Sequence, residues 1–418
     1  MLAHSPPLPL IIDYGLLSDT EDEEGAILAL KQRDRVHRVR LLMPVTSMQK
    51  FISIMDEEYP ILEYLIIETP DANTSSILIL PETLQAPNLR HLTLVGFALT
   101  IGSRLLTTAV GLVSLSLMIT PPTYFPPNAL LHWLSFMPEL KTLVIVFTFG
   151  IPNREIERQL MHAPIITPVT LPNLHRFRFR GVSAYLEALV HRITTPRLKK
   201  LQIFFFNQLT FSIPRLVQFT NTTENLRFDS VRFQFNDRQV YVHIYPHDRA
   251  EMNPLFINVS CWHLDWQVAS VAQIFNSLSQ LSSAVEHLTL ELEVHSRSSE
   301  EHNEVDRTNS EWRKLLRPFR NVKTFHIGNG LVEQLSRCLE SKDGELPLEL
   351  LPELQELTYS GSHDAGNGFT SFIDTCQSAD RAITLVRRSP SPDSVIPSKT
   401  SLITPATGEA GNFNNFNA

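Results

Sequence analysis

Cysteine, glycine and long apolar runs are scarce in this 418-residue sequence, and each scarcity excludes a class of protein. The three cysteines, Cys261, Cys338 and Cys376, lie far apart, without the close pairs that build zinc sites or disulfide frameworks. No run approaches the roughly 18 apolar residues of a transmembrane helix, and the opening MLAHSPPLPLIIDY lacks the basic start of a signal peptide. We expect a soluble intracellular protein, cytoplasmic or nuclear, with no membrane contact.

Motifs for catalysis and cofactor binding are also missing. With only 15 glycines, the sequence contains neither GxxxxGK[ST] nor GxGxxG, so no phosphate-binding loop is expected. HExxH and GxSxG are absent as well. We therefore expect no enzyme activity, no cofactor and no metal. Lys and Arg total 36 against 44 Asp and Glu, and the net charge of −8 offers no general attraction for nucleic acid. Any basic site must be local.

A repeated motif is what the sequence does have. APNLRHLTLVG at 86–96 and LPNLHRFRFRG at 171–181 share the spacing L-x-x-L-x-L, in which any large apolar residue replaces Leu. Most intervals between copies are close to the roughly 20–29-residue period of leucine-rich repeats. Copies begin at Val36, Leu62, Leu89, Leu112, Leu140, Leu174 and Leu198, at a deviant copy near Phe228, and again at Val285, Val322 and Leu354.

The spacing predicts an α/β fold, an irregular leucine-rich-repeat solenoid over 1–388. In x-L-x-L the two apolar residues lie on one face of a strand, and one strand alone has nothing to bury them against. Stacking the strands in parallel gives a continuous core, with the sheet on the concave face and helices and loops on the convex face. Helical periodicity predicts return helices at 23–31, 48–57, 129–137, 184–191, 268–281, 312–316 and 331–339.

Three segments depart from the repeat. Between about 231 and 264 apolar residues alternate in steps of two, which predicts antiparallel strands and a β-rich interruption of the array. Residues 295–311 are almost entirely polar, and we expect an exposed mobile loop there. The tail 389–418 is rich in Ser, Thr, Pro and Asn without periodicity, which is typical of disorder.

Candidate ligand and modification sites are weak. His243, His247, Cys261 and His263 come nearest to a metal cluster, but ordinary strand surface is the simpler interpretation, and Trp262 and Trp266 fit core or cap positions. The acidic run DTEDEE at 19–24 fits a helix N-terminus. A kinase site at Ser18 or Thr20 is the alternative use of this run. In the tail, RRSPSP places Ser389 and Ser391 before prolines, as in proline-directed phosphorylation sites, and the sequence does not decide whether Ser18, Ser389 or Ser391 is phosphorylated.

The most informative polar residues occupy the x positions of the strands, which face away from the core. Neighbouring cations there repel one another, which favours a counter-charge from a partner, so we predict a concave-face binding site for an acidic or phosphorylated protein. A solvated polar face with coincidental arginines is the alternative. The predicted contact residues are Arg176, Arg178, Arg180, Lys200, Phe204 and Arg232.

The chain resembles the F-box/leucine-rich-repeat proteins of mushroom-forming (basidiomycete) fungi. The resemblance is carried by HSPPLPLIIDY near the start, by APNLRHLTL and TPRLKKLQI, and by the closing ELTYSG and FTSFIDTCQSADRAITLV, which look like that family's terminal helix and strand. It implies the target-recognition part of a cullin-RING ubiquitin-ligase receptor. The chain begins where an F-box would already have ended, so a Skp-type adaptor is expected as a partner only if an F-box lies upstream.

We therefore expect a non-catalytic repeat module that binds another protein. Two alternatives stay open: a hydrolase-type enzyme on a repeat scaffold, with its site in 231–264, or a decayed paralogue without a partner. The sequence does not identify the target, the physiological role, or whether an F-box was lost.

Overall fold

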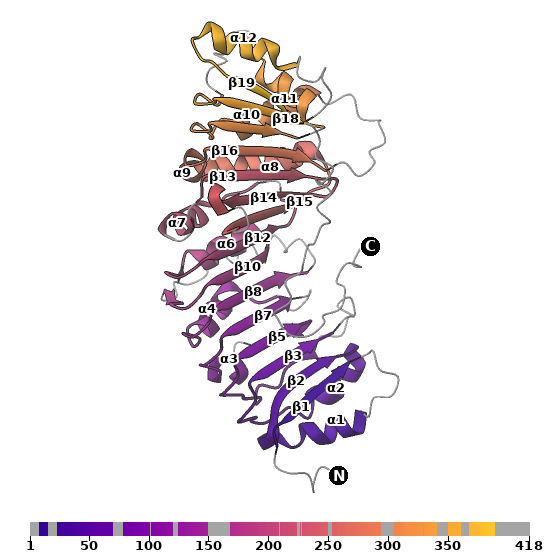
Figure 1. Cartoon of the computed structure of the whole chain (residues 1–418). Helices are drawn as coiled ribbons and strands as arrows, with labels where there is room; N and C mark the ends of the chain where they lie inside the picture. Colours follow the sequence, from indigo (N-terminus) through magenta and orange to yellow (C-terminus); the bar gives the residue numbers. More distant parts are fainter. Residues whose placement is uncertain are drawn as a thin grey trace.

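The described strands, nearly all of them parallel, stack side by side and form one open sheet of 15 strands, from β1 at one end to β19 at the other (Figure 1). Helices such as α8 and α10 lie behind this sheet in the view of Figure 1. The computed structural model describes residues 8–15, 23–69, 78–100, 102–119, 124–148, 168–208, 210–223, 226, 228–249, 253–293, 305–328, 330–340, 350–360 and 368–388.

The strands follow one another in nearly sequential order across the sheet. Their spatial order is β1 (Leu10–Gly15), β2 (Val36–Leu42), β3 (Tyr64–Glu68), β5 (His91–Val95), β7 (Ser114–Ile119), β8 (Thr142–Phe147), β10 (Arg176–Gly181), β12 (Lys200–Phe205), β15 (Leu255–Ser260), β14 (Gln239–Tyr245), β13 (Ser230–Phe235), β16 (His287–Leu292), β17 (Thr324–Ile327), β18 (Glu356–Ser360) and β19 (Thr384–Arg388). Two small parallel pairs accompany it, β4 (Leu78–Ile79) with β6 (Phe97–Ala98) and β9 (Val169–Thr170) with β11 (Ile193–Thr194).

The repeated motif builds the core as predicted. Leu92, Leu115, Leu143, Phe177 and Leu201 are register partners on five successive strands, and all are buried. Because each lies at the same position of its own L-x-x-L-x-L copy, one apolar row continues from strand to strand. The expected α/β leucine-rich-repeat type of solenoid is confirmed.

Helices return the chain behind the sheet. A described helix falls on each of the seven segments predicted to be helical, although α2 begins and ends earlier than expected. The helices are α1 (Glu23–Leu30), α2 (Val45–Ile52), α3 (Arg104–Thr108), α4 (Pro127–Leu134), α6 (Ser183–Val190), α7 (Pro214–Thr222), α8 (Leu264–Ser277), α9 (Ser279–Ser283), α10 (Val305–Leu316), α11 (Val332–Leu339) and α12 (Thr370–Ser378), with the short 3₁₀ turns η2 (Arg33–Arg35) and η3 (His247–Arg249). Within the described residues, none of these helices is long and apolar enough to span a membrane.

The prediction of a mobile loop over 295–311 is wrong for its last part, because α10 already begins at Val305. Trp312, Leu315 and Leu316 are fully buried and anchor the end of this helix. Helix propagation costs less than nucleation, so polar residues upstream extend an anchored helix without an apolar pattern of their own. Residues 295–304, the tail 389–418, Ser18, Ser389 and Ser391 lie outside the described residues.

The expected antiparallel interruption is confirmed, and its topology is specific. β13 and β14 form an antiparallel hairpin, and β14 pairs antiparallel with β15. β15 then lies parallel to β12, whereas β13 lies parallel to β16. The chain thus passes over two strand positions after β12 and fills them on its way back. Among the described strands of the large sheet, β14 alone runs against the others.

The glycine that closes the motif serves two different purposes. At Gly181 a Cβ atom would lie 2.8 Å from Phe179 Cζ and 2.9 Å from Phe147 Cδ2, so the absence of a side chain lets two aromatic rings pack over the strand end. Gly96 instead has a φ of +83°, in the left-handed region where side chains are strained.

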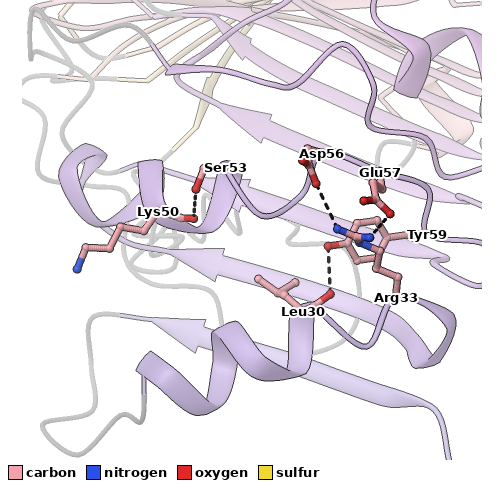
Figure 2. Close-up of polar contacts among 7 residues, drawn as sticks. All are labelled: Leu30, Arg33, Lys50, Ser53, Asp56, Glu57 and Tyr59. Atoms are coloured by element: carbon pink, nitrogen blue, oxygen red, sulfur yellow. Dashed lines mark hydrogen bonds and ion pairs between the residues drawn. The ribbon is translucent and has the colours of Figure 1, made fainter.

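Polar contacts tie the first repeats together around Arg33 and Tyr59 (Figure 2). Arg33 pairs with Asp56 at 3.3 Å and also with Glu57. The buried Tyr59 hydroxyl donates to the Leu30 carbonyl oxygen at 3.2 Å, which links the end of α1 to the segment before β3.

This contact predicts a loss of stability in alkali. Burial raises the pKa of Tyr59 from 10.0 to about 12, although Arg33 acts in the opposite direction. The contribution of the protonated Tyr59 hydroxyl to stability is therefore fully present below pH 10 and is lost as the pH rises toward 12. Tyr59→Phe is expected to flatten this dependence, at a cost of about 0.5–1.5 kcal/mol at neutral pH for the lost hydrogen bond. Urea unfolding on both sides of pH 10 measures it; an unchanged alkaline slope in the variant would contradict it.

Candidate functional site: the open face of the sheet

One face of the sheet carries side chains that the helices do not cover, and we call it the open face. Along most strands the residues alternate between buried and partly exposed, as in Arg176–Gly181, where Phe177 and Phe179 are buried. Where neighbouring strands both alternate, as β10 and β12 do, their partly exposed residues are register partners and form rows across the sheet. This is the face on which the sequence analysis placed the partner site.

Three arginines of β10 form what we call the arginine row: Arg176, Arg178 and Arg180. Their register partners on β12 are Lys200, Gln202 and Phe204. The structure therefore brings five of the six predicted contact residues together on two adjacent strands. Four of these five are cations.

The arginine side chains are held in a common orientation. Arg176 Nη2 donates to Gln202 Oε1 at 3.0 Å. The guanidinium of Arg178 lies 4.7 Å from the centre of the Phe204 ring, and that of Arg180 lies 5.7 Å from Phe206. Each arginine thus leans over the β12 side, toward the residue two positions beyond its own register partner. Flat guanidinium groups stack on rings in this way while keeping their N–H groups free to donate.

The charges of the row are not neutralised within the described part of the chain. No ion pair of Arg176, Arg178, Arg180 or Lys200 with a carboxylate occurs among the described residues. Burial, reinforced by Arg176 and Arg180, lowers the pKa of Arg178. Burial lowers the pKa of Arg180, and burial together with Arg176 lowers that of Lys200. The cations repel one another, and an anion that binds here relieves the repulsion.

Arg232 does not belong to this cluster, so its expected place on a strand next to β12 was wrong, and its role as a contact residue stays a prediction. It lies on β13, and β15 and β14 separate that strand from β12. Arg232 Nη2 also pairs with Glu291 Oε2 at 2.6 Å, and Gln234 donates to the same carboxylate. The spacing pattern placed β13 directly after β12, whereas the strand that pairs with β12 arrives later in the chain. Arg232 therefore forms an ion pair with Glu291 within the sheet.

An aromatic cluster borders the arginine row, and Phe204 is its one member among the predicted contact residues. Phe256 packs 5.3 Å from Phe204, 5.1 Å from His243 and 6.1 Å from Tyr241, measured between ring centres. Phe256 and Tyr241 reach this place because β15 and β14 are inserted beside β12. The signal available in the sequence was the aromatic content of the alternating segments themselves. Through Arg178 and Phe204, the charged and aromatic surfaces are continuous.

A second stack, which was not predicted from the sequence, lies on the open face toward the N-terminus. The guanidinium of Arg38 lies 5.5 Å from the centre of the Tyr64 ring, and Tyr64 stacks on His91 at 4.3 Å. All three residues hold the same position in successive copies of the motif, directly before the second apolar residue. Comparing that one position from copy to copy would have found the stack.

His243, once a candidate ligand, is a packed strand residue. Its Nδ1 accepts a hydrogen bond from Asn253 Nδ2 at 2.7 Å, and its ring packs on Phe256. Burial lowers the pKa of His243 from 6.5 to about 4; Arg232 acts in the same direction, and Glu291 opposes it. The imidazole is therefore neutral at physiological pH.

This histidine predicts a loss of stability in acid. The unfolded state takes up the His243 proton near pH 6.5 and the folded state only near pH 4. The stability gained from keeping His243 neutral is therefore fully present above pH 6.5 and is lost as the pH falls from 6.5 toward 4. The free energy of unfolding should be higher at neutral pH than at about pH 5, and we expect His243→Gln to remove roughly 1–2 kcal/mol of that difference. Urea unfolding at both pH values measures this; a variant with the wild-type pH dependence would contradict it.

The other histidine, cysteine and tryptophan candidates do not assemble into a site. His247 stacks on His287 at 3.9 Å, Cys261 is buried, and His263 packs on Trp266 at 5.5 Å. Within the part of the chain that is described, no group of three His, Cys, Asp or Glu residues is placed to hold a metal ion. Trp262 and Trp266 are 67% and 52% exposed, so neither is a core residue, and the cap position stays a prediction. Trp262 lies in the turn from β15 into α8 and Trp266 in the first turn of α8, beyond the apolar alternation that marks the core.

Repeated parallel strands, return helices and an uncovered sheet face define an open α/β solenoid of leucine-rich-repeat type. No protein-family model and no curated protein matches the chain. Among solved structures, the crystal structure of the leucine-rich repeat-containing protein LegL7 from Legionella pneumophila is similar at 11% sequence identity, covering 86% of this chain and 97% of that chain with a TM-score of 0.30. The fold class rests on the strand register of this chain, because so remote a likeness carries no argument.

Proposed function

We propose that this protein is a non-catalytic binding module that holds an acidic or phosphorylated protein on its open face. The observation that carries the proposal is the arginine row beside Lys200: four cations on two adjacent strands, without a carboxylate partner among the described residues. Like charges gathered in this way cost free energy in the unbound protein. Bound carboxylates or phosphates would accept charge-assisted hydrogen bonds from guanidinium groups that are already oriented.

Charge reversal tests the proposal. The triple variant Arg176→Glu, Arg178→Glu and Lys200→Glu is expected to bind a fluorescein-labelled decaglutamate peptide at least about 100-fold more weakly than the wild type, as judged by fluorescence polarisation at low salt. The control variant Arg104→Glu, Arg317→Glu and Arg320→Glu makes the same change in net charge at exposed positions off the open face. It is expected to lose far less affinity. Equal losses in the two variants would show only general electrostatic attraction and would sink the proposal.

We further propose that the module serves as the target-recognition part of a ubiquitin-ligase receptor. The support is the sequence resemblance to F-box/leucine-rich-repeat proteins, carried by segments such as TPRLKKLQI, which runs into β12. Under this proposal the chain contacts the target, and the adaptor contact comes from an F-box module. Pull-down with purified Skp-type adaptor and cullin tests it: the chain fused to an F-box should be retained, and the chain alone should not. Retention of the chain alone would contradict the division of labour.

A further inference from the structure

The arginine row repeats at a fixed interval along β10. Arg176, Arg178 and Arg180 are alternate residues of one strand, so their Cα atoms are spaced by about 6.6 Å, twice the rise per residue of a parallel strand. The same interval separates alternate side chains of any extended peptide. Three cations at this interval match three anions on alternate residues of an extended segment lying along the strand.

The neighbouring strands leave one flank of the row uncharged. The register partners on β8 are Thr142, Val144 and Val146. On the other side Gln202, Phe204 and Phe206 hold the guanidinium groups by the contacts described above. Among the described residues, the Nε atoms of Arg176 and Arg178 have no acceptor. The row is therefore oriented before a ligand arrives, which lowers the entropic cost of binding.

The two ends of the row differ in charge. Arg176 has Lys200 as its register partner, at the roughly 4.8 Å spacing of adjacent strands. Arg180 instead has Phe204 beside it and Phe206 beneath its guanidinium. A dianionic phosphate therefore has two cations to contact at the Arg176 end, and a monoanionic carboxylate is matched by the single cation at the Arg180 end.

We propose, building on the proposed function, that the open face binds an extended protein segment with acidic side chains at alternate positions, and that the end at Arg176 and Lys200 takes a phosphorylated residue. The partner is recognised by the interval between its charges as well as by their number. A segment with the same charges in consecutive positions places alternate carboxylates on opposite sides of its backbone, so fewer of them reach the row.

Two labelled peptides of identical composition test the interval: Ser-Glu-Ser-Glu-Ser-Glu-Ser and Ser-Ser-Glu-Glu-Glu-Ser-Ser. Fluorescence polarisation is expected to give about tenfold tighter binding of the alternating peptide, which corresponds to about 1.4 kcal/mol. Arg178→Gln, which removes the middle cation, is expected to reduce the preference to about two- to threefold, whereas the exposed Arg104→Gln leaves it unchanged.

Phosphoserine placed in the alternating peptide tests the charged end. In place of a terminal glutamate it is expected to tighten binding more than in place of the central one, because either peptide direction brings a terminal acid to Arg176 and Lys200. Lys200→Gln is expected to remove this advantage. Equal gains at terminal and central positions would overturn the assignment of the phosphorylated residue.

The outcomes separate this inference from the proposed function. Equal affinity for the alternating and consecutive peptides, lost on triple charge reversal, would refute the interval and leave an acidic-protein site in place. No measurable binding of either peptide, with decaglutamate also unbound, would refute both. An oligothymidylate that binds more tightly than every peptide would overturn the assignment of a protein ligand, since a nucleic-acid backbone also carries regularly spaced anions.

Discussion

Replacing Trp312 with alanine is expected to lower the free energy of unfolding by about 3–5 kcal/mol, the cost of deleting a large aromatic side chain from a packed core. Trp312 lies in α10 and is fully buried. Its ring meets Phe235 edge-on at 5.3 Å, and Phe235 belongs to β13. The contact therefore joins a return helix to the strand where the parallel array resumes.

Trp266 provides a matched control, because it is also a helical tryptophan but is 52% exposed. Trp266→Ala is expected to change stability by less than about 1 kcal/mol. Urea unfolding followed by far-UV circular dichroism measures both variants without depending on the tryptophans as probes. Similar losses in the two variants would contradict the packing seen around α10.

Solenoids also unfold locally, because each repeat contacts only its neighbours. We expect Trp312→Ala to weaken the C-terminal repeats first, giving an unfolding curve broader than that of the wild type. Amide hydrogen exchange should then show lost protection in β13 and β16 and unchanged protection in β3 and β5. Uniform loss along the whole sheet would mean that the protein unfolds as one unit.

The core could be predicted from the sequence because its cause is local. In each copy, alternate apolar residues of one strand must share a face, whatever lies elsewhere in the chain. Leu143 and Phe177 are therefore register partners for a reason visible within eight residues of each. The same rule placed Arg176, Arg178 and Lys200 on the opposite face and in adjacent strands, and this is how most of the candidate site was found.

Strand order is a different kind of problem, since it depends on which edges meet in space. The alternation in 231–264 predicted antiparallel strands, but β12 could have been followed by β13 or by β15 without any change in that pattern. The wrong placement of Arg232 and the missed contact of Phe256 with Phe204 follow from this one ambiguity. The charges gave a partial clue: Arg232 had an acidic residue to pair with in Glu291, whereas the arginine row had none among the described residues.

Among the described glycines on the N-terminal side of the sheet, Gly96 is the one where an added methyl group should do the most harm. Its φ of +83° costs a residue with a side chain roughly 1–2 kcal/mol. A Cβ atom would also collide with the hydroxyl of Thr69, which is 2% exposed and donates to the Val95 carbonyl oxygen at 3.1 Å. Relieving that collision breaks the hydrogen bond and leaves a buried polar group, at a further cost of about 1–3 kcal/mol.

Gly96→Ala is therefore expected to lose about 2–4 kcal/mol in total. Gly111→Ala is the control, because a Cβ atom there would have no neighbour within 4 Å and its φ lies outside the left-handed region. We expect that control to change stability by less than about 1 kcal/mol. Urea unfolding compares the two variants, and adding Thr69→Val to Gly96→Ala distinguishes the causes. If the collision matters, the second substitution costs much less in the Gly96→Ala background than in the wild type, because the hydrogen bond is already broken. Additive losses would assign the whole effect to backbone strain.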